Sequence, residues 1–229
     1  MASIAIASNL LPVRLTALAG DVGGPAGLTY EQRGRIVASM FTGFVVALFV
    51  TGPVADRTHP RPFLAGGNLL VGLGLLGMAG ARSYAMAMAG AIAAGFGSGS
   101  LDMVLSPLVA ALRPERRATE LNRLHATYCL AAVAVTALAA ALLRGGLRWR
   151  TILAGHALLP LTGAAVSLCI RLPALVTAGA ARTGLRQLLQ ERRFWAVLGI
   201  MAGIGGGMAG ISQWLPAHAQ QTFGLSPSI

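Results

Sequence analysis

The sequence has few charged residues, very few acidic ones and no lysine. Charged residues make up 11% of its 229 residues, whereas an average soluble domain carries about 25%. That shortage excludes an ordinary water-exposed surface. Hydrophobic residues make up 55% of the chain and the mean hydropathy is +0.68, so the composition indicates a membrane protein whose main partner is the lipid bilayer.

The few charges are strongly one-sided, with 18 basic residues against 7 acidic ones and a net charge of +11. A nucleic-acid-binding domain would gather such charge on one wet face. Here the arginines stand in short clusters between long apolar runs. We therefore expect no nucleic-acid partner.

Motifs for enzyme chemistry are also lacking. The two cysteines, Cys129 and Cys169, lie inside apolar runs and form no disulfide framework or metal-ligand spacing. The sequence contains no GxSxG or HExxH motif and no phosphate-binding loop followed by lysine. A GxGxxG match over 205–210 lacks the strand that a dinucleotide site requires. We expect no enzyme activity, no cofactor and no metal.

Long apolar runs dominate what is present, and a membrane-crossing helix needs about 20 such residues. Seven segments qualify or nearly qualify: 1–19, 35–55, 63–82, 84–112, 122–143, 150–171 and 194–216. The first is interrupted by Asn9, Pro12 and Arg14. It also ends like a signal-peptidase site, but a signal peptide needs an early positive charge and none precedes Arg14. A shortened first span is therefore the preferred interpretation.

The arginines predict the orientation, because cytoplasmic loops carry the excess of basic residues. The loops after the second, fourth and sixth spans hold eleven arginines: Arg57, Arg61, Arg113, Arg116, Arg117, Arg123, Arg171, Arg182, Arg186, Arg192 and Arg193. The other side holds six, three of them in the turn 144–150. We expect a multi-pass protein of a bacterial inner membrane with its amino terminus in the cytoplasm.

These spans predict an all-α protein in three parts. Residues 1–171 would form a six-helix transmembrane lobe and 172–193 a cytoplasmic linker. The linker ends in the run RQLLQERR, which fits a short amphipathic helix at the membrane surface. Residues 194–229 would begin a second lobe.

The loop after the second span, from Gly52 to Arg61, reads GPVADRTHPR. It resembles the loop signature of the major facilitator superfamily. The resemblance implies that Gly52, Asp56, Arg57 and Arg61 form a conformational latch, in which a carboxylate pairs with arginines or with a helix amino terminus.

Three further stretches are similar to the fucose permease-like branch of that superfamily, which comprises sugar:proton symporters. They are GFGSGSLD at 95–102, LNRLHATY at 121–128 and WLP at 214–216. The chain departs from the branch at Ser106, where relatives tend to carry asparagine, and at Met208, where many carry an acid. The resemblance implies two lobes that rock about a central site. This chain would then be truncated after its seventh helix and would need a second lobe or another chain.

Asp102 is the one acidic residue well inside an apolar run. It stands eleven residues before Arg113, which places it about 16 Å deep at ~1.5 Å per residue. An intramembrane carboxyl is costly and therefore usually functional, here as a proton acceptor. The alternative is that Asp102 only accepts hydrogen bonds from a neighbouring helix. Helical spacing puts Gly95, Ser98, Gly99, Asp102 and Ser106 on one side of the helix, which can line a cavity or allow close helix packing.

Other polar residues near the spans are candidates for solute or proton contacts. Asn122 and His125 are one turn apart near the start of the fifth span, where a capping role is the alternative. Gln213 and Trp214 suit sugar binding, although a tryptophan anchored at the membrane surface is the simpler explanation. We expect His156 to be a hydrogen-bonded interior histidine.

The leading hypothesis is a proton-coupled transporter of a small, sugar-like polar solute. A drug or metabolite exporter of the same superfamily is one alternative, but it calls for an aromatic-lined cavity and aromatics are only 6% of the chain. A non-transporting remnant is the other alternative.

Overall fold

The computed structural model describes residues 1–23, 27–55, 58–170, 172 and 185–223. Within its helices, the side chains of 11–17, 19, 185, 186, 188, 208–210 and 212–223 are outside the description. The described residues form helices and no strand, which confirms the all-α prediction. The chain divides into two compact units, Met1–Val176 and Thr177–Ile229.

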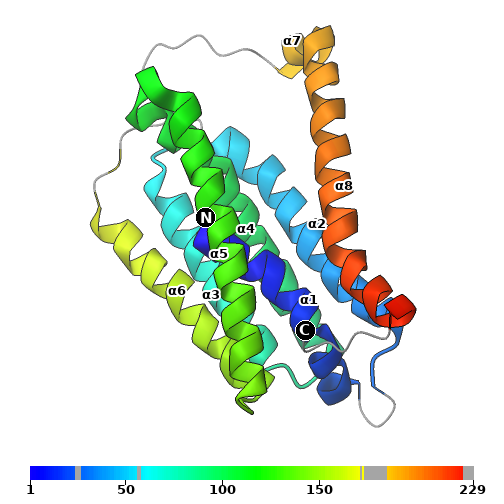
Figure 1. The fold of residues 1–229 in the computed structure, drawn as a ribbon. Helices are drawn as coiled ribbons and strands as arrows, with labels where there is room; N and C mark the ends of the chain where they lie inside the picture. Colours follow the sequence, from blue (N-terminus) through cyan, green and yellow to red (C-terminus); the bar gives the residue numbers. More distant parts are fainter. Residues whose placement is uncertain (24–26, 56–57, 171, 173–184, 224–229) are drawn as a thin grey trace. The chain divides into compact units, whose positions relative to one another are not determined.

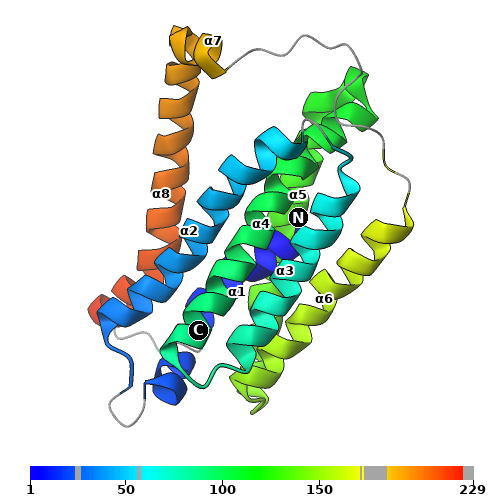
Figure 2. The same ribbon diagram turned by 180° about the vertical axis from the view of Figure 1, so that it is seen from behind.

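The first unit is a bundle of six long helices (Figures 1 and 2). They are α1 (Ala2–Val22), α2 (Tyr30–Ala55), α3 (Arg61–Ala79), α4 (Tyr84–Leu112), α5 (Arg117–Arg144) and α6 (Trp149–Cys169). A single 3₁₀ turn, Pro114–Arg116, precedes α5. α4 packs against both α2 and α3, α3 packs also against α6, and α1 packs against α5.

The second unit contains the short helix α7 (Leu185–Gln190) and the long helix α8 (Arg192–Phe223). α7 overlaps the run 186–193, for which a short surface helix is predicted, and begins one residue before it. α8 continues without a break through Gly205, Gly206 and Gly207. The GxGxxG match therefore lies inside a helix, which is the wrong context for a dinucleotide site.

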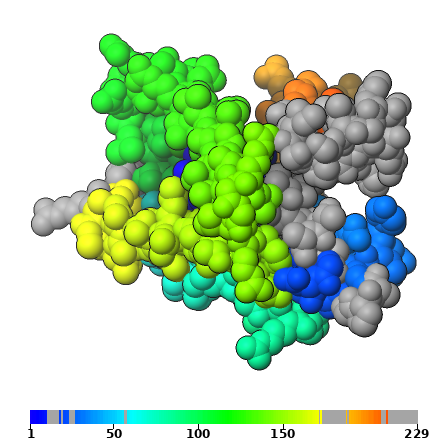
Figure 3. Space-filling view, turned by 60° about the horizontal axis from the view of Figure 1, so that its bottom comes forward, coloured from blue at the N-terminus to red at the C-terminus, as the bar shows by residue number. Residues whose placement is uncertain are grey.

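Five of the described helices, α2 to α6, are long and apolar enough to cross a membrane. Their outward side chains are correspondingly apolar, as at Phe49, which is 77% exposed, and Leu130, which is 72% exposed. On α5 only Val135 and Ala139 are buried, and Figure 3 shows this helix at the surface of its unit. Such exposed apolar faces suit contact with lipid.

The predicted spans miss several helix ends because apolar runs do not register the residues that start and stop helices. α2 begins five residues earlier than predicted, after a capping box. There the Gln32 backbone N–H donates to Thr29 Oγ1 at 3.2 Å and the Thr29 backbone N–H donates to Gln32 Oε1 at 2.9 Å. α3 ends at Ala79 rather than residue 82, because Gly80 caps it and Ser83 already caps α4.

Glycines bring the α4 backbone into direct contact with its two neighbours. A Cβ on Gly95 would collide with the Met40 carbonyl of α2, and one on Gly99 would collide with the Phe44 carbonyl. Toward α3, a Cβ on Gly67 would lie 3.0 Å from the Gly97 carbonyl oxygen. We call the close contacts of Gly95, Gly97 and Gly99 with α2 and α3 the glycine seam. Small residues allow such packing where lipid gives helices no hydrophobic reason to associate.

A polar cluster ties three helices together at the end of the bundle where α1 and α3 finish and α6 begins. Asp21 Oδ2 accepts hydrogen bonds from Trp149 Nε1 at 2.9 Å and from Arg150 Nε at 3.2 Å. Arg150 Nη1 donates to the Ala79 carbonyl at 2.7 Å, and its guanidinium lies 4.6 Å from the Trp149 ring centroid. We call this group the Asp21 clamp.

The glycine seam predicts that Gly95→Ala destabilises the first unit. The new methyl group would meet backbone that cannot move aside as a flexible side chain can, and overpacking of this kind costs about 1–3 kcal/mol. Thermal unfolding of the full chain in detergent should therefore show a lower midpoint. Gly66→Ala is the matched control, since nothing lies within 4 Å of its added Cβ. Equal midpoints for both variants would contradict the seam.

The Asp21 clamp predicts a pH dependence of stability. Asp21 lies beyond the first predicted span, 1–19, and its pKa is lowered from the usual value, first by the Trp149 hydrogen bond and also by Arg150. A carboxyl with a depressed folded-state pKa stabilises the fold above its unfolded pKa of about 3.9, and that stability is lost as the pH falls. Asp21→Asn should lower the unfolding midpoint at about pH 7 and flatten its fall at acid pH.

The control is Glu115→Gln, which removes an exposed carboxylate outside the clamp. It should keep the acid-dependent fall of the parent chain. If Asp21→Asn falls as steeply with acid as the parent does, the clamp makes no pH-dependent contribution.

Candidate functional site

Asp102 lies on α4 and is half-buried. Its carboxylate interacts electrostatically with His125 of α5 and with the amino end of α1. Figures 1 and 2 show the start of α1 inside the bundle. The structure thus brings two predicted candidates, Asp102 and His125, into one electrostatic neighbourhood formed by three helices.

The other predicted candidates are distributed more widely. Ser106 is half-buried one turn beyond Asp102, and Asn122 is exposed near the start of α5. The side chains of Gln213 and Trp214 lie outside the described residues. The predicted close packing of the small face of α4 is confirmed at Gly95 and Gly99, which meet α2.

Two polar contacts near α1 join Asn9, a weaker candidate from the sequence, and Ser3 to residues that sequence reasoning did not select, Tyr128 and Asn68. Asn9 Nδ2 donates to the Tyr128 hydroxyl of α5 at 3.3 Å and to the Ala5 carbonyl at 2.9 Å. The Ser3 hydroxyl donates to Asn68 Oδ1 of α3 at 2.6 Å. Asn68 was detectable as the single amide in the run 63–82, because a polar side chain inside a span usually faces other helices.

A third interior contact joins α2 and α4. The hydroxyl oxygens of Thr51 and Ser100 lie 3.0 Å apart, and both side chains are buried. Such a bond satisfies two polar groups that lipid would leave without partners. Polar side chains therefore connect α4 and α5 to the helices around them.

At the opposite end of the bundle from the Asp21 clamp, the loop between α2 and α3 holds the end of α6. Arg61 Nη2 donates to the Ile170 carbonyl at 2.6 Å, and His59 Nε2 lies 3.0 Å from the Leu172 carbonyl. These contacts bond two backbone carbonyls just past the end of α6. His59, Arg61, Pro62 and Leu172 line an open hollow of about 470 Å³ there.

Of the remaining latch residues, the structure describes only Gly52. Gly52 is buried on α2, where an added Cβ would meet the Met103 side chain of α4. Asp56 and Arg57 lie outside the described residues. The predicted pairing of Asp56 with arginines therefore stays a prediction.

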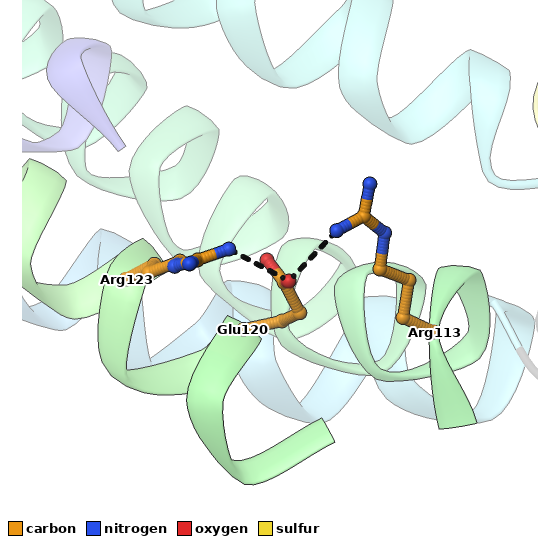
Figure 4. A network of polar contacts seen from close by, with 3 residues as sticks. All are labelled: Arg113, Glu120 and Arg123. Atoms are coloured by element: carbon orange, nitrogen blue, oxygen red, sulfur yellow. Dashed lines mark hydrogen bonds and ion pairs between the residues drawn. The ribbon is translucent and has the colours of Figure 1, made fainter. Parts of the chain in front are cut away.

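A charged network fixes the turn between α4 and α5 on the same end of the bundle (Figure 4). Glu120 Oε1 accepts from Arg113 Nη1 at 3.2 Å and from Arg123 Nη1 at 3.0 Å. Glu120 stands in the first turn of α5, where a negative charge also suits the helix dipole. This network explains why α5 begins at Arg117, five residues before the predicted apolar run.

His156 of α6 is an interior, hydrogen-bonded histidine, as predicted. It is 9% exposed, and its Nδ1 lies 2.7 Å from the Ile152 carbonyl oxygen. Among the described residues, no group of three or more histidine, cysteine, aspartate or glutamate side chains is placed to hold a metal ion.

Comparison with known proteins assigns the family. The model of the Major Facilitator Superfamily matches residues 1–229, which is the full sequence. No curated protein matches the chain. The helical bundle and the apolar spans agree with a multi-pass membrane protein of that kind. The chain therefore belongs to the Major Facilitator Superfamily, whose members are secondary transporters rather than enzymes.

Proposed function

We propose that this chain carries a small, sugar-like polar solute across a bacterial inner membrane together with protons, with its amino terminus in the cytoplasm. Membership of a family of secondary transporters supports carriage of a solute. The observation that carries the proton part is Asp102, a half-buried carboxylate on an interior helix that interacts electrostatically with His125. No cofactor is needed, because a solute or proton gradient drives such transport.

Asp102 would act as the proton acceptor. A carboxyl in the membrane interior is costly to keep charged, and protonation or hydration from one side at a time relieves that cost. A group that is hydrated alternately from each side can take up a proton on one side and release it on the other. His125 and Asn122, from α5, and Ser106, from α4, would offer hydrogen bonds to the solute near this group. In the second unit, Gln213 and Trp214 of α8 are further candidates for solute contacts.

Alternating access needs two lobes that rock about a central site. Residues 1–171 would provide one lobe, 172–193 the connecting linker and 194–229 the first helix of the second lobe. The rest of that lobe would come from the same polypeptide or from another chain.

The latch would be the α2–α3 loop, with Gly52, Asp56, Arg57 and Arg61. Support comes from Arg61, which already bonds the end of α6 through the Ile170 carbonyl. This loop would hold the carboxyl end of α6 in one conformational state and release it in another. Movements of the lobe would then be coupled to the linker that follows α6.

The proton role predicts the behaviour of Asp102→Asn in proteoliposomes that contain both lobes. Solute accumulation driven by a proton gradient should fall to the outside concentration, because the amide cannot take up a proton. Exchange of labelled for unlabelled solute should continue, since it needs no net proton movement. Glu115→Gln is the control and should accumulate solute normally. Unchanged accumulation by Asp102→Asn would sink the proposed role.

The latch predicts a different defect for Arg61→Gln. Loss of the bond to the Ile170 carbonyl should slow the conformational cycle, so the maximal transport rate falls while the half-saturating solute concentration stays within about twofold of the parent value. The control is Arg82→Gln, in the turn between α3 and α4 at the opposite end of the bundle. If the rate is unaffected and solute affinity falls instead, Arg61 acts at the binding site and not as a latch.

A further inference from the structure

The turn between α4 and α5 carries more positive than negative charge, and its charged side chains are mostly exposed. Residues 113–123 contain four arginines and two glutamates, namely Arg113, Arg116, Arg117, Arg123, Glu115 and Glu120. All of them except Glu120 are exposed. The turn therefore presents an excess of positive charge to its surroundings.

Figure 4 shows that one carboxylate holds two of these arginines. Glu120 Oε1 lies 3.2 Å from Arg113 Nη1 and 3.0 Å from Arg123 Nη1. The Glu120 side chain is only 16% exposed, whereas those of Arg113 and Arg123 are 61% and 64% exposed. A guanidinium has five N–H donors, and the bonds to Glu120 use one from each arginine. Glu120 thus positions two exposed cations but balances the charge of only one.

Two more arginines of the turn are not balanced by an acid. Arg116 ends the 3₁₀ turn and Arg117 begins α5. In the part of the chain that the structure describes, no ion pair joins either of them to a carboxylate. Their charge is therefore available to a negatively charged partner.

The turn also lies where a lipid headgroup is expected. It joins two helices that are long and apolar enough to cross a membrane, so it stands at a membrane surface. Exposed apolar side chains continue from it along both helices, as at Leu112 of α4, which is 57% exposed, and Leu130 of α5, which is 72% exposed. Basic clusters directly beside a membrane-spanning helix are typical of binding sites for anionic headgroups.

We propose that this turn binds the phosphate of an anionic phospholipid, with Arg113 and Arg123 as the positioned pair and Arg116 and Arg117 as further donors. Guanidinium groups suit phosphate oxygens because they offer paired N–H donors in a fixed plane. The excess positive charge favours a headgroup with net negative charge over a zwitterionic one. The acyl chains would lie against the apolar helices. This inference goes beyond the proposed function, because lipid binding does not require transport.

The test is native mass spectrometry of the full chain in detergent, titrated with phosphatidylglycerol. Arg113→Gln combined with Arg123→Gln should weaken lipid binding by about tenfold or more, since each basic residue near an anionic headgroup contributes several-fold. The matched control is Arg82→Gln combined with Arg148→Gln, which removes the same charge from exposed positions at the opposite end of the bundle. It should stay within about threefold of the parent. Equal losses in the two double variants would overturn the site.

The rise of the thermal unfolding midpoint on lipid binding is the second readout. Phosphatidylglycerol should raise the midpoint of the parent more than phosphatidylcholine does. Inorganic phosphate at the same concentration should raise it less, because it lacks acyl chains. Equal rises with phosphatidylcholine, or a rise with inorganic phosphate alone, would overturn the assignment to an anionic lipid. If the first double variant fails to fold, Arg116→Gln combined with Arg117→Gln replaces it and should weaken binding in the same way.

Discussion

The architecture depends on direct backbone contact between α4 and its neighbours α2 and α3. Lipid tails are as apolar as leucine, so helices gain little by hiding apolar surface from them and must hold together by close fit. The glycine seam provides this fit, because Gly95 and Gly99 admit α2 and Gly97 admits α3. The same helix carries Asp102, whose carboxylate interacts electrostatically with His125 of α5 and with the amino end of α1. The seam therefore fixes the helix that carries Asp102 against α2 and α3.

A second constraint is that hydroxyl and amide groups inside the bundle need partners. Several meet it within their own helix: Asn9, Asn68 and Ser98 donate to carbonyls four residues back, at 2.8–2.9 Å. Bonds between helices, as from Asn9 to Tyr128, are added to these local ones. His156 follows the same local rule with one ring nitrogen and departs from it with the other. Among the described residues, Arg61 Nε and the Tyr84 hydroxyl are likewise buried without a hydrogen-bond partner.

Sequence reasoning predicted the helices themselves, because an apolar run of about 20 residues is the length that a membrane-crossing helix needs. It missed the starts of α2 and α5, which are set by Thr29 with Gln32 and by Glu120 with its arginines. It selected Asp102 because a carboxyl inside a span is rare, and His125 because it forms a polar pair with Asn122. From helical spacing it offered close packing as one of two uses of the helix face that carries Gly95, the other being the lining of a cavity. It passed over Tyr128 and Asn68, since which helix lies opposite a given face is a tertiary property that one sequence does not encode locally.

The glycine seam also separates positions of α4 that cannot accept substitutions during evolution from positions that can. At Gly95 and Gly99 even a methyl group meets the backbone of another helix, so these positions are closed to substitution unless α2 shifts as well. Asp102 and Ser106 stand on the same helix but are only half-buried. Their chemistry can be exchanged without disturbing the frame. New solutes or coupling ions can then arise on an unchanged scaffold, one side chain at a time.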